Sequence, residues 1–331
     1  MVKSPETKQS KQIINDLIFR ELIKRGYSLE GNTRVWNIAD SKLWYLTPEQ
    51  AQGYLDLERD KGYQKNVIGN EIDLIKTNID SITSFIDSGS VNIIDLGCGD
   101  GKKAVIFLTK LKEKLKEKNI QDTKIRYCPI DISNYMVEKA LTKVREADIE
   151  EIVTFQWNIS DFENIENVAS LLRHGNYKRN LFLLLGNTLG NFEINELLYE
   201  IRSAMKDGDI LVVGNGLDNR SSEAILKTYN NKQIDNWLIK ILTQIGIKRE
   251  DVKYGARFKN LRIEEYYVFL KDVQIDFLGK KLLFNKDDQI ITAVSYKYEA
   301  DEFKSFLKMY FSESNIFISK DKSYALAVCK K

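Results

Sequence analysis

The residues with the clearest chemical content are the seven from Asp95 to Gly101, Asp-Leu-Gly-Cys-Gly-Asp-Gly, which follow a short apolar run. Gly97, Gly99 and Gly101 let the backbone approach a ligand closely, and a helix that begins after them points its free N–H groups into the turn. Asp95 stands two positions before the first glycine, where a carboxylate can meet the ammonium group of an amino-acid-like ligand. The loop lacks the GxGxxG spacing that seats a pyrophosphate, which disfavours a nicotinamide dinucleotide.

Carboxylates also follow the next two predicted strands. Asp131 closes the run Tyr-Cys-Pro-Ile-Asp, at the place where α/β folds put a carboxylate on a ribose hydroxyl pair. Asp161 and Phe162 follow the third strand and suit the amino group and the ring face of an adenine. Together with the glycine loop, these residues predict a cationic nucleoside ligand, S-adenosylmethionine. A structural glycine turn with incidental acids is the alternative.

The elements that would position these residues form a regular alternation. Between Val91 and about residue 218, short apolar runs alternate with helical patterns at βαβ spacing. Runs that are apolar almost throughout are typical of strands covered on both faces. The sequence therefore predicts an α/β fold with a doubly wound, mainly parallel sheet.

The pattern changes on both sides of this core. Apolar residues recur at helical spacing over 13–25 and 68–86, and the runs at 262–270, 272–278, 280–284 and 289–298 alternate as antiparallel strands do. We therefore expect a smaller α+β substrate domain beside the core. The predicted segments are a flexible tail (1–12), the N-terminal helical part of the substrate domain (13–88), the core (89–218), the inserted α+β part (219–298) and a final helix with strands of the core (299–331).

Composition excludes several other kinds of function. The 331 residues carry 50 Lys and Arg against 48 Asp and Glu, so the net charge of +2 predicts no nucleic-acid partner. A single histidine, His174, and three scattered cysteines predict no metal site. The sparse cysteines and the polar N-terminus predict a cytoplasmic protein, and no window is apolar enough to predict a membrane span. The oligomeric state is left open.

The fourth predicted strand ends in Gly-Asn-Thr-Leu-Gly-Asn-Phe, residues 186–192. With the segments above, this run resembles the histidine N-alpha-methyltransferases of ergothioneine biosynthesis, a family that includes fungal dimethylallyltryptophan N-methyltransferases. Similar segments are Lys42–Tyr45, Pro129–Ser133, Tyr229–Asn231 and Thr292–Tyr298. The resemblance extends from about residue 40 to the C-terminus and is strongest over 91–218.

The resemblance implies a sheet of the S-adenosylmethionine-dependent methyltransferase type and a set of site residues. The cofactor, released as S-adenosylhomocysteine, would contact Tyr63, Asp95, Gly97, Cys98, Gly99, Lys102, Asp131, Ile132, Asp161, Phe162, Gly186 and Asn187. On the substrate side, the resemblance has Asn191 hold the amino or carboxylate group, while Tyr45 and Tyr229 orient that head group. Ser295 and Ala293 would lie near the substrate's side chain.

Ala293 departs from the family pattern. Histidine-specific members carry a glutamate there that accepts a hydrogen bond from the imidazole, which an alanine cannot do. We therefore expect in-line methyl transfer to the amino group of an amino acid or related small amine other than free histidine. The alternatives are a methyltransferase for a protein or other macromolecule and a module that binds S-adenosylmethionine without catalysis. A nicotinamide-dependent oxidoreductase is disfavoured, because Asp131 lies thirty residues past Gly101.

Overall fold

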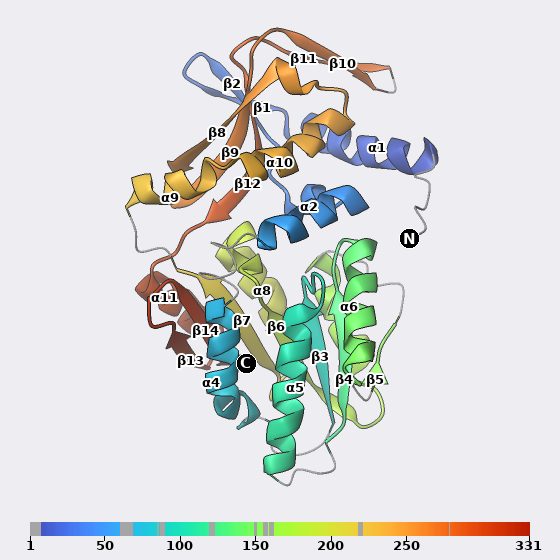
Figure 1. The fold of residues 1–331 in the computed structure, drawn as a ribbon, viewed down its shortest axis with the longest axis vertical. Helices are drawn as coiled ribbons and strands as arrows, with labels where there is room; N and C mark the ends of the chain where they lie inside the picture. Colours follow the sequence, from blue (N-terminus) through green and yellow to red (C-terminus); the bar gives the residue numbers. More distant parts are fainter. Residues whose placement is uncertain are drawn as a thin grey trace. The chain divides into compact units, whose positions relative to one another are not determined.

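The computed structural model describes residues 8–59, 69–84, 86, 90–118, 123–148, 151–154, 158, 162–217, 221–277 and 279–331, except the side chains of residues 8–14 and 163 (Figure 1). The chain forms two compact units. Unit 1 comprises Met1–Tyr54 and Arg220–Ser295, and unit 2 comprises Leu55–Asn219 and Tyr296–Lys331.

Unit 2 is built on a seven-stranded sheet. Its strands are β3 (Ser90–Leu96), β4 (Ile125–Ile130), β5 (Glu151–Ile152), β6 (Tyr177–Leu184), β7 (Ile210–Gly216), β13 (Glu313–Ile318) and β14 (Tyr324–Lys330). They lie in the order β13-β14-β7-β6-β3-β4-β5. Neighbouring strands from β7 to β5 are parallel, and β14 and β13 join antiparallel at the edge beside β7. The predicted α/β fold with a mainly parallel sheet is confirmed.

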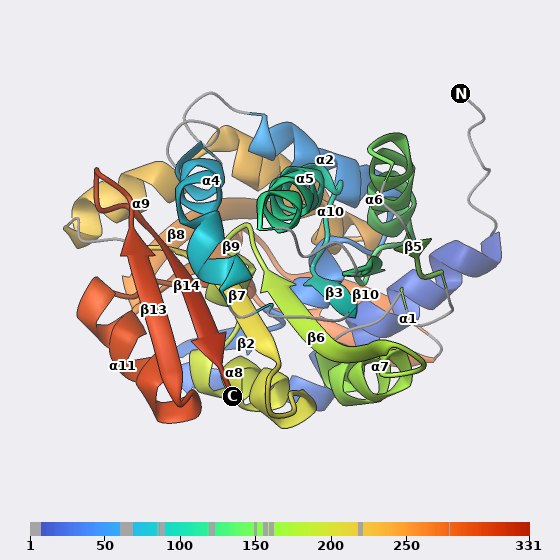
Figure 2. The same ribbon diagram turned by 90° about the horizontal axis from the view of Figure 1, so that it is seen from below.

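Helices cover both faces of this sheet (Figure 2). One face carries α4 (Gly69–Thr83), α5 (Lys102–Glu117) and α6 (Asn134–Glu146), and the other carries α7 (Ile165–Leu172), α8 (Ile194–Ala204) and α11 (Ala300–Tyr310). The two faces follow from the alternation of side chains along each strand. Ile93 of β3 shares a hydrophobic cluster with Phe107 of α5, whereas its neighbour Ile94 shares one with Leu198 of α8. All four side chains are fully buried, as expected for strands covered on both sides.

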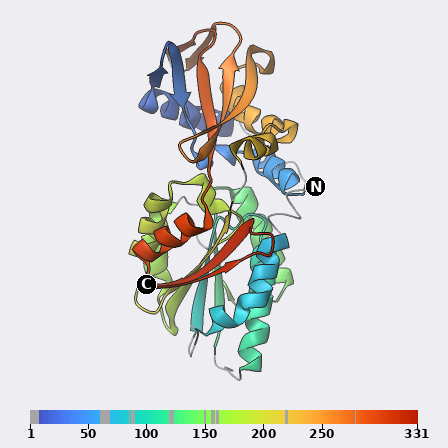
Figure 3. The ribbon, with the colours of Figure 1, turned by 90° about the vertical axis from the view of Figure 1, so that its left-hand side faces the viewer.

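Unit 1 contains a five-stranded sheet and a hairpin. The sheet strands are β1 (Tyr27–Glu30), β2 (Thr33–Asn37), β8 (Val252–Lys259), β9 (Arg262–Phe269) and β12 (Gln289–Tyr296), in the order β1-β2-β12-β9-β8, and the hairpin strands are β10 (Val273–Phe277) and β11 (Lys280–Phe284). The α-helices are α1 (Lys8–Arg25), α9 (Ser222–Tyr229), α10 (Lys232–Gln244) and α2 (Pro48–Glu58), which starts in this unit. Figure 3 shows the blue β1–β2 hairpin beside the orange strands of the same unit.

Three details of unit 1 differ from the prediction. α1 begins at Lys8, within the segment expected as a flexible tail. Residues 27–37 form a hairpin, and β2 pairs parallel to β12, although the alternation over 289–298 predicted antiparallel neighbours. The sequence pattern over 222–246 predicts one helical stretch, but it is divided in two, because the side chain of Asn231 accepts the Gln233 N–H and caps the start of α10.

The boundary between the units also differs from the predicted one. The segment 13–88 was expected in the substrate domain, but its part from Leu55 onward belongs to unit 2. The reason is the apolar face of α4, where Leu74, Ile75 and Ile79 pack in one cluster with β3 and α5. Among the helices of the described ranges, none is both long and apolar enough to cross a membrane.

Candidate active site

The glycine loop between β3 and α5 has a backbone that only glycine adopts easily. Gly97, Gly99 and Gly101 have φ of 70°, 52° and 77°, all in the left-handed region. A Cβ on Gly101 would lie 2.6 Å from the Cα of Ala140, so the absent side chain lets α6 pack against the loop. A Cβ on Gly99 would meet no atom of the described residues within 4 Å. The loop is therefore closely packed at Gly101 and open at Gly99.

Asp131, directly after β4, is tied to this loop. One carboxylate oxygen accepts the Gly99 N–H at 3.1 Å, and the other accepts the Ser133 N–H at 3.0 Å. Burial raises the pKa of Asp131 from its ordinary 3.8 to about 6, although the N–H groups of Ser133, Gly99 and Ile132 favour the charged form. Three backbone donors do not offset the loss of water. Within the described residues, the hydrogen bonds to this carboxylate come from backbone N–H groups, so it can still accept a hydrogen bond from a ligand.

Asp95, the penultimate residue of β3, is a second carboxylate of the same kind. It is buried and accepts a hydrogen bond of 2.6 Å from the hydroxyl of Tyr127. Burial raises its pKa from 3.8 to about 6, Tyr127 and the charge of Lys103 oppose that rise, and the charge of Asp131 adds to it. β3 and β4 are adjacent and parallel, so both carboxylates lie at the same edge of the sheet. This edge favours a cation.

The turn after β6 comes to the same edge. Gly186 and Asn187 both have positive φ, 76° and 63°. The side chain of Asn187 accepts the Gly216 N–H at 2.8 Å, which fixes the turn to the end of β7. The 3-10 helix η5 (Thr188–Asn191) follows, and the methyl of Thr188 would lie 3.2 Å from a Cβ on Gly97. The β6 turn and the glycine loop are therefore in contact, with the half-buried Asn191 at the end of η5.

Other predicted cofactor residues fall in different surroundings. Cys98 is buried and clusters with Val137 and Ala140 of α6, and burial raises the pKa of its thiol well above the ordinary value. Phe162 is half-buried, and its ring centroid lies 5.1 Å from that of Phe192, just after η5. Tyr63 and Asp161 lie outside the described residues.

Two lysines follow the glycine loop, and the one predicted to contact the cofactor, Lys102, is not the one that is half-buried. The side chain of Lys102 is exposed, whereas the half-buried Lys103 places its Nζ 3.5 Å from Glu58 and 3.9 Å from the fully buried Glu71. Sequence reasoning missed both Lys103 and Glu71. A signal for Glu71 exists, because it stands three and four positions before Leu74 and Ile75 and thus in line with the apolar stripe of α4. A carboxylate on a buried stripe is unusual unless it has partners.

Unit 1 brings two of the predicted substrate residues together. The hydroxyl of Tyr229, at the end of α9, donates to Oγ of Ser295 on β12 at 3.2 Å. The hydroxyl of Tyr254 donates to the Tyr229 carbonyl and to Glu265, each at 3.0 Å, which holds the end of α9 against β8 and β9. Ala293 is 1% exposed, so its methyl group contributes an apolar, packed position next to this polar pair.

Tyr45 belongs to an aromatic cluster of unit 1 with Trp44, Tyr54 and Trp237. Its ring centroid lies 5.3 Å from that of Tyr54 and 5.8 Å from that of Trp237. The indole N–H of Trp44 donates to the carbonyl of Thr292 at 2.9 Å, which connects the cluster to β12. Half-buried Tyr45 is therefore held by its neighbours in an aromatic setting.

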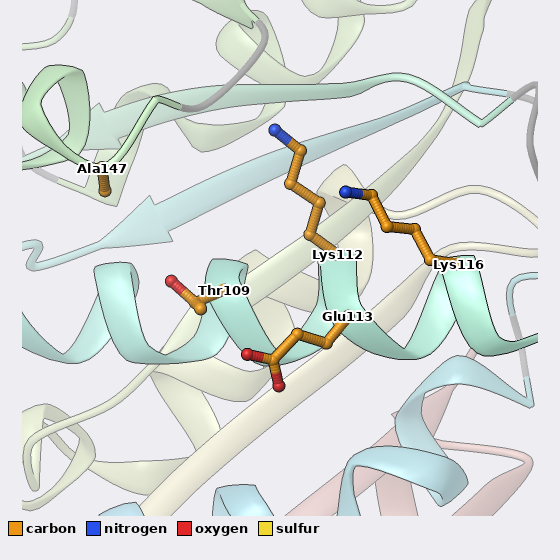
Figure 4. Close-up of a pocket in the computed structure, with 5 residues that line it drawn as sticks. All are labelled: Thr109, Lys112, Glu113, Lys116 and Ala147. Atoms are coloured by element: carbon orange, nitrogen blue, oxygen red, sulfur yellow. The ribbon is translucent and has the colours of Figure 1, made fainter.

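A pocket on unit 2 lies along α5, away from the glycine loop of the same unit (Figure 4). It is lined by Thr109, Lys112, Glu113, Lys116 and Ala147. Thr109 is seven residues into α5, roughly 10 Å along the helix from its start beside the glycine loop. Its polar lining consists of two lysines, a glutamate and a threonine from α5, and contains none of the residues at the acidic strand ends.

The predicted residues thus divide between the units. Unit 2 gathers Asp95, the glycine loop, Asp131, the β6 turn and η5 at the carboxyl ends of its parallel strands, where α/β sheets bind ligands. Unit 1 carries Tyr45, Tyr229, Ala293 and Ser295. The strand ends suit a ligand that combines positive charge with hydroxyl groups. Two buried carboxylates with raised pKa values and an open Gly99 are the features that fit an S-adenosylmethionine.

Comparison with known proteins agrees with this fit. A family model described as "Histidine-specific methyltransferase, SAM-dependent" matches residues 64–331. No curated protein matches the chain. Among solved structures, an S-adenosylmethionine-dependent methyltransferase from Clostridium acetobutylicum is 13% identical, with 84% of this chain and 98% of that chain covered and a TM-score of 0.41. The CurJ carbon methyltransferase is 12% identical over 99% of this chain and 72% of that one, with a TM-score of 0.46.

Proposed function

Because the chain belongs to the family of histidine-specific, S-adenosylmethionine-dependent methyltransferases, we propose that it methylates the amino group of an amino acid or a related small amine. The cofactor supplies a methyl group on a positively charged sulfur and leaves as S-adenosylhomocysteine. The observation that carries the proposal is the pair of buried carboxylates, Asp95 and Asp131, which lie together at the carboxyl ends of adjacent parallel strands and there favour a ligand with positive charge and hydroxyl groups.

The cofactor half of the proposal rests on unit 2. Asp131 would hold the ribose hydroxyl groups, and Asp95 would meet the ammonium group of the cofactor's methionyl part. The open backbone at Gly99 and the turn at Gly186 and Asn187 leave room for a ligand to approach main-chain atoms. Roles for Tyr63, Cys98, Lys102, Asp161 and Phe162 rest on the resemblance to the family.

The acceptor half rests on four polar side chains. We assign the amino or carboxylate group of the acceptor to Asn191, and the orientation of that head group to Tyr45 and Tyr229. The hydrogen bond between Tyr229 and Ser295 supports this assignment, because it holds two hydroxyl groups in one place within unit 1. Hydroxyl groups can both donate to and accept from an amino acid head group.

These side chains would act mainly by alignment. Methyl transfer needs an unprotonated nitrogen about 3–3.5 Å from the methyl carbon, with water kept away. An amino group is mostly protonated near neutral pH, so the site has to accept its proton or bind the minority free base. A tyrosine hydroxyl such as that of Tyr45 would orient the amine through a hydrogen bond, with the proton passing to solvent.

The second part of the specificity concerns the side chain of the methyl acceptor. The family description names histidine, whereas the buried methyl group of Ala293 cannot accept a hydrogen bond from an imidazole. A site without that acceptor loses its discrimination for a polar ring. We therefore propose an acceptor with a side chain larger or more apolar than that of histidine.

The test is methyl transfer from labelled S-adenosylmethionine to a panel of amines that contains L-histidine, the aromatic amino acids and the corresponding decarboxylated amines. We expect S-adenosylhomocysteine and an N-methylated product, identified by mass spectrometry, with an aromatic or aliphatic amino acid ahead of histidine. Cofactor binding without turnover of any amine would contradict the enzymatic proposal. Preferred turnover of L-histidine would contradict the role given to Ala293.

Tyr45→Phe probes the head-group assignment with the acceptor that the panel identifies. We expect kcat/KM for that acceptor to fall about tenfold, the scale of one hydrogen bond to a charged or polar head group, with cofactor affinity unchanged. The Phe ring preserves the aromatic cluster, so thermal unfolding should stay close to that of the wild type. Unchanged kcat/KM in a folded variant would remove Tyr45 from the proposed site.

A further inference from the structure

Glu71 is the most completely enclosed carboxylate near the β6 turn. It projects from the first turn of α4 and is 0% exposed. Both of its oxygens accept the backbone N–H of Gly186, at 2.8 and 3.1 Å, and one of them accepts the hydroxyl of Tyr324 at 2.6 Å. Donors converge on the side chain from the turn after β6 and from strand β14, an arrangement that suits an ionised acceptor.

A lysine from the glycine-loop side completes this group. Nζ of Lys103, in the first turn of α5, lies 3.9 Å from Glu71 and 3.5 Å from Glu58. We call Glu58, Glu71, Lys103 and Tyr324 the Glu71 network. Burial raises the pKa of Glu71, and the charge of Lys103 and the donors from Tyr324 and Gly186 oppose that rise. The network therefore supplies the partners that a carboxylate on an apolar helix face needs.

Two glycines leave the space that the network occupies. A Cβ on Gly186 would lie 2.2 Å from Nζ of Lys103. A Cβ on Gly214 of β7 would lie 2.2 Å from a carboxylate oxygen of Glu71 and 2.7 Å from the hydroxyl of Tyr324. A side chain at Gly214 would therefore displace Glu71 or Tyr324, and one at Gly186 would displace the end of Lys103 and be strained by the positive φ of 76°.

The helix that carries Glu71 is fixed at the same end. The amide of Asn70 donates to both carboxylate oxygens of Asp321, at 2.9 and 3.1 Å, and to the hydroxyl of Ser323 at 2.9 Å. Asp321 and Ser323 lie in the turn between β13 and β14. The first turn of α4 is therefore held to the C-terminal hairpin one residue away from Glu71.

We propose that Glu71 is a positioning residue that holds the Gly186–Asn187 turn and the start of α5 in the shape the cofactor requires. This inference rests on the proposed contact of that turn with the cofactor. Gly186 and Asn187 both have left-handed backbones, and Asn187 pays a steric penalty there that glycine does not. A turn of this kind needs outside support, and the two hydrogen bonds from Gly186 to Glu71 provide it.

The opposite edge of the same sheet offers a matched control. Asp209, just before β7, is 1% exposed and accepts the N–H groups of Asn180 and Lys206, each at 2.8 Å. Its side chain also pairs with Arg173. It is therefore a buried carboxylate with backbone donors and a cation, as Glu71 is, but it stands at the amino end of a parallel strand.

The experiment compares Glu71→Gln with Asp209→Asn. S-adenosylhomocysteine binding is measured by calorimetry, amide hydrogen exchange of the peptide around Gly186 by mass spectrometry, and stability by thermal unfolding. For Glu71→Gln we expect affinity to fall about tenfold and exchange at Gly186 to accelerate, because a charged acceptor is replaced by a neutral one. For Asp209→Asn we expect a lower unfolding temperature, with affinity and Gly186 exchange within twofold of the wild type.

Tyr324→Phe serves if Glu71→Gln does not fold, because it removes one donor to Glu71 and keeps the ring. We expect its affinity to fall roughly threefold with the same local acceleration of exchange. Unchanged S-adenosylhomocysteine affinity in either Glu71-network variant overturns this inference but not the proposed function. An equal loss of affinity in Asp209→Asn does the same. Wild-type protein that binds no S-adenosylhomocysteine overturns the proposed cofactor site, and this inference with it.

Discussion

Asp209 and Asp131 are both buried carboxylates of unit 2 that accept backbone N–H groups, but they stand at opposite edges of one sheet. Asp209 precedes β7 and pairs with Arg173, so its charge is balanced within the chain. Asp131 follows β4, and burial raises its pKa to about 6 because backbone N–H groups alone do not balance it. Asp95, at the same edge, has its pKa raised to about 6 as well.

We interpret the difference as one between strand ends that stabilise the fold and strand ends that, under the proposed function, bind the cofactor. The amino ends of the strands are completed by the chain's own groups, such as the bond from the Asn92 amide to Asn180 at 2.8 Å and that from Arg126 to Asn92 at 2.8 Å. The carboxyl ends hold negative charge that a positive ligand would balance. Groups with strongly perturbed pKa values are frequent at functional sites for this reason.

The largest effect is expected at the amino ends of the parallel strands. Arg173→Leu leaves the carboxylate of Asp209 buried without its cation, and removing one partner of a buried ion pair costs about 3 kcal/mol. We expect the free energy of unfolding, from urea titration, to fall by this amount while affinity for S-adenosylmethionine stays within twofold. A variant as stable as the wild type would contradict the contrast between the edges.

Asp131→Ala is the corresponding change at the carboxyl edge. We expect calorimetry to show about 100-fold weaker binding of S-adenosylmethionine, about 2.7 kcal/mol, the scale of hydrogen bonds to a charged group. Near neutral pH and without ligand, the unfolding temperature of Asp131→Ala should fall less than that of Arg173→Leu. The reason is that Asp131→Ala removes a buried charge, whereas Arg173→Leu leaves one unpaired. Binding unaffected by the change would remove Asp131 from the cofactor site.

The raised pKa values give a smaller effect that depends on pH. Between about pH 4 and 6 the folded protein keeps protons on Asp95 and Asp131 that the unfolded chain releases near 3.8. Their contribution to stability is therefore present at low pH and is lost as pH rises through about 6. We expect the stability of ligand-free Asp131→Asn relative to the wild type to increase from pH 4.5 to 7.5. S-adenosylmethionine affinity of the wild type should rise over the same range, and a flat profile would contradict the raised pKa values.

The smallest effect is expected in unit 1. It would separate the role of unit 1 from that of the strand ends of unit 2. Tyr229→Phe and Ser295→Ala each remove the hydrogen bond between the two side chains. We expect about fivefold lower kcat/KM for the methyl acceptor in each variant, and a double variant little worse than either, because the two act as one pair. Cofactor affinity should not change. Additive losses would show that the two hydroxyl groups act separately.

Local patterns were sufficient for most of unit 2. The apolar runs that predicted buried strands correspond to β3, β4, β6, β7 and β14, since strands covered on both faces have to be largely apolar. Asp95 and Asp131 were identified for the same reason, because a polar residue at the end of such a run lies at the edge of the sheet. The helix expected directly after the glycine loop begins at Lys102, as predicted.

Unit 1 was harder to predict because its pairing is not local. The hairpin over 27–37 has short strands, one of them exposed throughout, and β2 finds its partner β12 more than 250 residues later in the chain. Nothing in the alternation of 289–298 distinguishes a parallel from an antiparallel neighbour. The strand β8 was also missed, since its side chains after Val252 are half-buried or exposed and show no apolar alternation.

The amino-acid sequence by itself determined the doubly wound sheet, the glycine loop and the acidic strand ends, because each depends on spacing within one segment. Only the tertiary structure decided which of two adjacent lysines turns inward and what Glu71 does. Glu71 and Tyr324 are 253 residues apart, and their hydrogen bond exists because α4 packs across β14. Contacts of this kind follow from the packing of whole elements, and no short pattern in the sequence encodes them.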